Sequence, residues 1–225
     1  MRREGSGASG LAGERRRRRG VGAGALALGA AAACGPGPLL TMGGARDAST
    51  FQDLDRAEMR KLDAAEALAR AIDGPAGPLA RLLAAVPADA WDHRADPPPR
   101  RADTPAEVQE RLRAAFPPRF AFVGYWTVPW SREIGFDAYD NRIALSTRWL
   151  GKLDAGAYAG ILWHEVAHKA GYAHDGDRRG GNQCTVPYLV GDAARVAAAW
   201  PATGRWGEPP ADACPGLAAA LAAAW

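Results

Sequence analysis

The segment WHEVAHKAGYAHDGD, residues 163–177, contains three of the four histidines of the chain, and their spacing restricts how it can fold. His164 and His168 are four residues apart, so on a helix both imidazoles project from one face, one turn from each other. His174 follows six residues later, beyond Gly171. A straight helix would carry His174 away from the other two, whereas a turn at the glycine would bring all three rings together. The spacing therefore predicts a helix that ends at Gly171.

The same residues indicate a metal site. A catalytic zinc ion usually has three protein ligands and one open position, and His164, His168 and His174 supply three imidazoles. Glu165 follows the first histidine and is rotated about 100° from it around the helix. Its carboxylate can therefore lie beside the open position and accept a proton from a metal-bound water. We expect one Zn²⁺ per chain and Glu165 as the general base of a hydrolytic reaction.

The eleven residues HEVAHKAGYAH resemble the zinc signature HExxHxxGxxH of the metzincins, a family of peptidases. The match falls on His164, Glu165, His168, Gly171 and His174. The resemblance implies a zincin-like fold, zinc as the cofactor, and hydrolysis of peptide bonds in a peptide or protein substrate.

The chain departs from the metzincins downstream of this motif. Metzincins have a methionine-containing turn after the third histidine, but the methionines here all precede the motif: Met1, Met42 and Met59. The segment TVPYLVGD, residues 185–192, occupies roughly that place. Together with NRIALSTRWL, residues 141–150, it resembles uncharacterised exported bacterial proteins with the same zinc motif. The zinc site is therefore expected without the Met-turn.

Two more residues are candidates for the site. Tyr188 could place its hydroxyl near the metal or at the developing oxyanion, or its ring could simply pack at the start of a helix. Asp175 directly follows His174. It could orient a ligating imidazole, or it could belong to a solvated acidic loop.

The pattern along the chain predicts an α+β domain: a mostly helical N-terminal part, a short β-sheet before the site helix, and C-terminal helices. Thr50 is expected to cap the first helix, which Gly74 ends. Thr104 begins a capping box, TPAE, for a helix that Pro117 ends. The strands are expected at 119–128 and 141–146, and the other helices at 78–86, 154–170, 187–200 and 215–225.

Residues 1–33 have the pattern of an export signal, with an arginine run at 15–19 followed by an apolar stretch too short to span a membrane. Cys34 follows directly and resembles the lipidated cysteine of bacterial lipoproteins; cleavage near Ala33 without lipidation is the alternative. Residues 34–48 are rich in Gly and Pro and predict a flexible tether.

These features predict a signal peptide (1–33), a tether (34–48) and one zincin-like domain (49–225). The protein is then exported to the bacterial cell envelope, where a lipid on Cys34 would anchor it to the membrane; otherwise it is periplasmic or secreted. Two cysteines remain, Cys184 and Cys214, and in an exported protein they are expected to form a disulfide, with two buried thiols as the alternative.

The charge distribution does not favour nucleic acid as a partner. The net charge is +3, but seven of the 28 basic side chains and only two of the 25 acidic ones lie in residues 1–33. The remaining chain is slightly acidic, so its charge gives no reason to expect nucleic-acid binding.

The most specific function that these residues support is a zinc metallopeptidase, with cell-wall peptides among its candidate substrates. Two alternatives remain. One is an enzyme that hydrolyses another kind of amide. The other is an exported zinc-binding lipoprotein without catalysis, in which Asp175, His93 or a cysteine closes the metal site.

Overall fold

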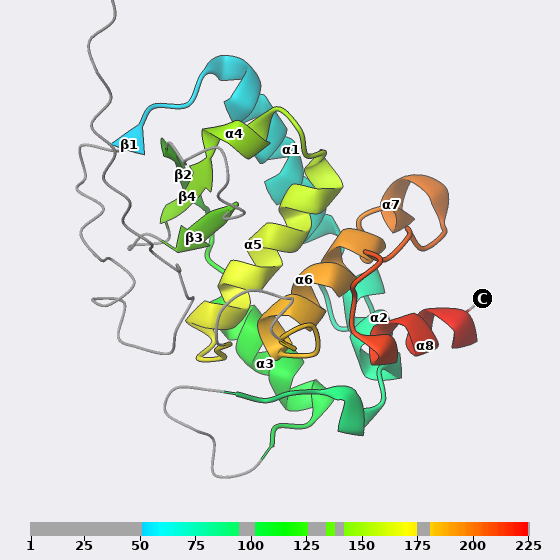
Figure 1. Cartoon of the computed structure of the whole chain (residues 1–225). Helices are drawn as coiled ribbons and strands as arrows, with labels where there is room; N and C mark the ends of the chain where they lie inside the picture. Colours follow the sequence, from blue (N-terminus) through cyan, green and yellow to red (C-terminus); the bar gives the residue numbers. More distant parts are fainter. Residues whose placement is uncertain (1–50, 95–101, 126–133, 138–141, 175–180, 225) are drawn as a thin grey trace, which may run out of the picture. The chain divides into compact units, whose positions relative to one another are not determined.

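The computed structural model describes residues 51–94, 102–125, 134–137, 142–174 and 181–224 (Figure 1). They form helices and one small sheet, so the predicted α+β class is confirmed. The predicted export signal, Cys34 and the tether lie outside the described residues. Among the described helices, none is both long and apolar enough to cross a membrane.

The sheet has four strands in the order β1-β2-β4-β3. The predicted strands correspond to β2 (Ala121–Tyr125) and β4 (Arg142–Ser146), which pair in parallel. Two further strands were not predicted: β1 (Phe51–Gln52), which pairs antiparallel with β2, and β3 (Gly135–Asp137), which pairs antiparallel with β4. Both are too short to produce a period-two pattern.

The first helix begins later than expected. Phe51 and Gln52 belong to the sheet, and Asp55 caps α1 in a capping box with Glu58. The predicted cap residue, Thr50, lies outside the described residues. The predicted capping box at Thr104 is present, with Glu107 as its partner. The first helices are α1 (Arg56–Ala71), α2 (Pro78–Ala85), α3 (Pro105–Ala115) and α4 (Thr147–Leu150). The later ones are α5 (Ala155–Lys169), α6 (Val186–Ala197), α7 (Trp200–Thr203) and α8 (Pro215–Ala223).

Helix α5, which includes His164, Glu165 and His168, is surrounded by other elements (Figure 1). It contacts α1, α3, α6 and β3. Helix α6 approaches closely because two glycines face each other: a Cβ on Gly160 would lie 2.6 Å from the carbonyl oxygen of Gly191. The close packing of α5 and α6 places the start of α6 beside the histidines.

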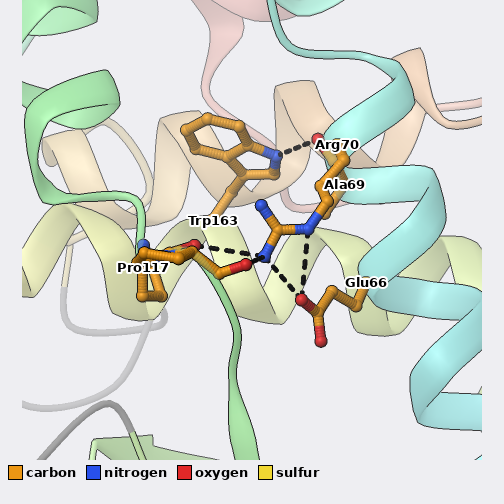
Figure 2. A network of polar contacts seen from close by, with 6 residues as sticks. Glu66, Ala69, Arg70, Pro117 and Trp163 are labelled. Atoms are coloured by element: carbon orange, nitrogen blue, oxygen red, sulfur yellow. Dashed lines mark hydrogen bonds and ion pairs between the residues drawn. The ribbon is translucent and has the colours of Figure 1, made fainter.

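Trp163, directly before the first histidine of the motif, fastens α5 to α1 on another face of the helix (Figure 2). Its side chain is 1% exposed, and its Nε1–H donates to the carbonyl of Ala69 at 3.1 Å. The ring also packs against Phe116, with ring centroids 4.6 Å apart. Near it, Arg70 donates to Glu66 and to the carbonyls of Pro117 and Pro118. These contacts hold α1, α5 and the end of α3 together.

The predicted disulfide is present between Cys184 and Cys214, whose Cα atoms are 4.8 Å apart. It links the chain just before α6 to the N-cap of α8. The carbonyl of Cys184 also accepts a hydrogen bond from the backbone of Asp92 at 2.9 Å. The bridge therefore constrains the segment that leads into α6.

Replacing both Cys184 and Cys214 with serine should lower the free energy of unfolding by about 3–4 kcal/mol, because the bridge closes a loop with a sequence separation of 30 in the unfolded chain. Urea denaturation without reductant measures the loss. Reduction of the parent protein should reproduce it. Equal stability of the double variant and the oxidised parent would contradict the prediction.

Candidate metal centre

His164, His168 and His174 come together as the spacing predicts, and they form a cluster that could hold a metal ion. Their Nε2 atoms are 3.2 Å apart in each of the three pairs. Two ligands of a tetrahedral zinc ion, each about 2.0–2.1 Å from the metal, lie about 3.3 Å from each other. The equilateral triangle of nitrogens therefore fits three corners of a tetrahedron and leaves the fourth to another ligand.

The turn at Gly171 brings the third histidine back. Gly171 has φ +94°, a left-handed conformation that glycine adopts without the steric cost of a Cβ. Its N–H donates to His168 at 2.9 Å, and the N–H of Tyr172 donates to Ala167 at 3.1 Å. This pair of bonds is the Schellman motif, which satisfies the last carbonyls of a helix. A Cβ at Gly171 would meet no atom within 4 Å, so the backbone conformation, not the space, requires glycine.

His168 is held in a form suited to metal binding. Its Nδ1 lies 2.9 Å from the carbonyl oxygen of Tyr172. Because a carbonyl only accepts, Nδ1 carries the hydrogen, and Nε2 of the neutral ring presents its lone pair to the cluster. Burial lowers the pKa of His168, with the Tyr172 hydrogen bond as a smaller opposing effect. The imidazole is therefore neutral at neutral pH, as a metal ligand must be.

His174 is 2% exposed, and neighbouring segments fix the backbone that leads to it. The N–H of Ala173 donates to the carbonyl of Arg94 at 2.9 Å. The Arg94 side chain donates to Asn182 at 2.9 Å and pairs with Asp92 at 2.8 Å. The segment after α5 and the segment before α6 are therefore both bonded to residues 92–94, next to the third histidine.

Tyr188, the third residue of α6, lies against two of the three imidazoles. Its ring centroid is 4.7 Å from that of His164 and 4.5 Å from that of His174. The ring of Tyr188 therefore packs at the start of α6 and lies beside two of the candidate ligands. A Cβ on Gly191, further along α6, would lie 3.2 Å from the Cβ of His164, so a small residue there leaves room for the imidazole.

Glu165 is 6% exposed and lies next to His164 on α5. His93 stacks on Trp91, with ring centroids 5.8 Å apart, and does not belong to the histidine cluster. Because the sulfurs of Cys184 and Cys214 are bonded to each other, neither thiol closes the metal site. Asp175 lies outside the described residues.

The contacts that Tyr172 makes through its side chain were not predicted from the sequence. The Tyr172 hydroxyl donates to Asp103 at 2.6 Å, across 69 positions of the chain. Tyr172 occupies a variable position of the motif, and Asp103 only precedes the predicted helix cap. No local signal connects them.

Three converging imidazole nitrogens, with the buried Glu165 directly after the first histidine in the sequence, make an arrangement suited to activating water. Comparison of the chain with known protein families, curated proteins and solved structures found no match. The function is therefore inferred from the residues of the site.

Proposed function

We propose that this protein is a zinc-dependent hydrolase and, more specifically, a metallopeptidase. The observation that carries the proposal is the triangle of Nε2 atoms of His164, His168 and His174, with edges of 3.2 Å. Three imidazoles suit zinc, and a three-ligand site with one position left for water is the catalytic arrangement of this metal. Zinc would lower the pKa of a water ligand towards about 7 and polarise a substrate carbonyl.

Glu165 is the proposed general base. It accepts a proton from the attacking water and then delivers that proton to the leaving amine. Glu165 directly follows a candidate ligand in the sequence and is 6% exposed, so little bulk water reaches the residue. Tyr188 is the proposed donor to the carbonyl oxygen of the substrate, a role supported by its contacts with His164 and His174.

Two observations support a peptide as the substrate. One is the resemblance of the motif to the metzincin signature. The other is β3, an antiparallel strand that contacts α5 and pairs with β4; no other strand pairs with it within the described part of the chain. An extended peptide can hydrogen-bond to such an edge, and this would hold it beside the site helix. Peptides of the cell wall fit the proposed export, and a lipid on Cys34 would hold the enzyme at the membrane.

The proposal is tested with the purified protein in its zinc-loaded and zinc-depleted forms. We expect about one zinc per chain, as for a single three-histidine site. Cleavage of quenched fluorescent peptides should be lost on zinc removal, return with zinc, and be inhibited by a hydroxamate. A parallel assay with peptidoglycan fragments distinguishes cell-wall peptides from other substrates.

Two histidine variants serve as a matched pair. His174→Ala should lose zinc and activity, whereas His93→Ala should keep both, because His93 is outside the cluster. A protein that binds zinc but neither binds the hydroxamate nor cleaves any peptide would instead have a closed, non-catalytic zinc site.

A further inference from the structure

Tyr172 lies between the second and third histidines, and its backbone contacts the end of the site helix twice. Its N–H donates to Ala167 at 3.1 Å and completes the turn after α5. Its carbonyl accepts from Nδ1 of His168 at 2.9 Å and orients that imidazole. His174 follows only two residues later. A shift of Tyr172 would therefore displace two of the three candidate ligands.

The side chain of Tyr172 is anchored to a different part of the fold. Its hydroxyl donates to Oδ2 of Asp103 at 2.6 Å, and the same oxygen forms an ion pair with Nε of Arg111 at 3.1 Å. Tyr172 is 3% exposed and Asp103 is 9% exposed, so water competes little with this bond. A short bond from a hydroxyl to a carboxylate is among the stronger hydrogen bonds in proteins.

Asp103 is itself well fixed. It directly precedes Thr104, whose side chain and backbone form the capping box of α3 with Glu107. The carboxylate thus directly precedes the capped first turn of a helix, and Arg111, two turns further along α3, forms an ion pair with it. The Tyr172 ring is therefore tied to α3, while its backbone belongs to the metal-binding turn.

We propose that Tyr172 and Asp103 are positioning residues of the metal centre. Their hydrogen bond holds the carbonyl that orients His168, and the start of the segment that bears His174, in the ligating arrangement before the metal binds. This inference rests on the metal centre of the proposed function and does not depend on the reaction catalysed there. Groups that orient metal ligands typically change metal affinity about 10–100-fold when they are removed.

The test measures the Kd of Zn²⁺ by competition with a chromophoric chelator, using the purified, zinc-depleted protein. Tyr172→Phe keeps the buried ring and removes only the hydroxyl, and it should weaken zinc binding about 10–100-fold. Asp103→Ala should have a similar effect. Because both substitutions break the same bond, the double variant should bind zinc about as well as the weaker single variant. Visible absorption of the Co²⁺-substituted forms reports whether the ligand geometry has changed.

Tyr158→Phe is the matched control. Tyr158 is another buried tyrosine; it lies on α5 and is 1% exposed. Its hydroxyl has no hydrogen-bond partner among the described residues. This variant should bind zinc with the parent Kd and show the parent Co²⁺ spectrum. Circular dichroism of each zinc-depleted variant verifies that it is folded.

An orienting group is expected to change zinc affinity about tenfold or more. The proposal is therefore overturned if folded Tyr172→Phe binds zinc with a Kd within about twofold of the parent value. It is also overturned if Tyr158→Phe weakens zinc binding as much as Tyr172→Phe does. Fully additive effects of the two substitutions would also overturn it. If the parent itself bound no zinc, the proposed function would fail as well. Normal zinc binding by the parent and by Tyr172→Phe would refute the positioning role alone.

Discussion

Replacing Glu165 with glutamine should reduce kcat/KM for peptide cleavage by about 10²–10⁴-fold, the usual contribution of a general base. The amide has nearly the same shape as the carboxylate but cannot accept a proton. Zinc content should be unchanged, because the cluster that could hold the metal consists of His164, His168 and His174. Zinc analysis and steady-state kinetics on the same preparation measure both quantities.

Glu110→Gln is a suitable control for this substitution, since Glu110 is an exposed residue of α3. It should retain the kcat/KM of the parent. If Glu165→Gln cleaved peptides as fast as the parent, Glu165 would not be the base. If it lost zinc instead, the carboxylate would belong to the ligands of the metal.

Replacing Trp163 with alanine should lower the free energy of unfolding by about 3–5 kcal/mol, the range for truncating a large buried aromatic side chain. Trp163 is 1% exposed and packs between α1, α5 and the end of α3 (Figure 2). Its removal leaves a cavity next to the helix that holds two of the candidate ligands. Urea denaturation followed by circular dichroism measures the change.

Two further variants separate packing from hydrogen bonding at this position. Trp163→Phe keeps an aromatic ring but loses the bond to the carbonyl of Ala69, and should cost only part of the alanine effect. Trp206→Ala, at a half-buried tryptophan, should cost less than Trp163→Ala. A loss below about 1 kcal/mol for Trp163→Ala would contradict the role of this residue as a packing anchor.

The structural features that are set by residues close together in the sequence could be predicted. The capping box at Thr104 is a local pattern of four residues, and it starts a helix as expected. The predicted start of α1 was wrong because Phe51 and Gln52 pair with Tyr125 and Gly124 in the sheet instead of joining the helix. A partner more than seventy positions away along the chain leaves no mark in the local sequence.

The candidate metal centre likewise has features that are set by local sequence and features that depend on distant contacts. The spacing of His164, His168, Gly171 and His174 within eleven residues determines that the three imidazoles converge, because helical periodicity and one left-handed turn are local properties. What surrounds the cluster depends on contacts between distant segments. Tyr188 reaches the histidines only because α6 packs closely on α5 at Gly160 and Gly191.

The sequence by itself therefore determined which residues form the candidate metal centre and where the chain turns to assemble it. Only the tertiary structure decided how that centre is supported: Asp103 meets the Tyr172 hydroxyl, and Trp163 meets the backbone of Ala69. The reason is physical. Ligand spacing follows from backbone geometry within a few residues, whereas a buried hydrogen bond between distant positions forms only when the packing of whole helices brings its two partners together.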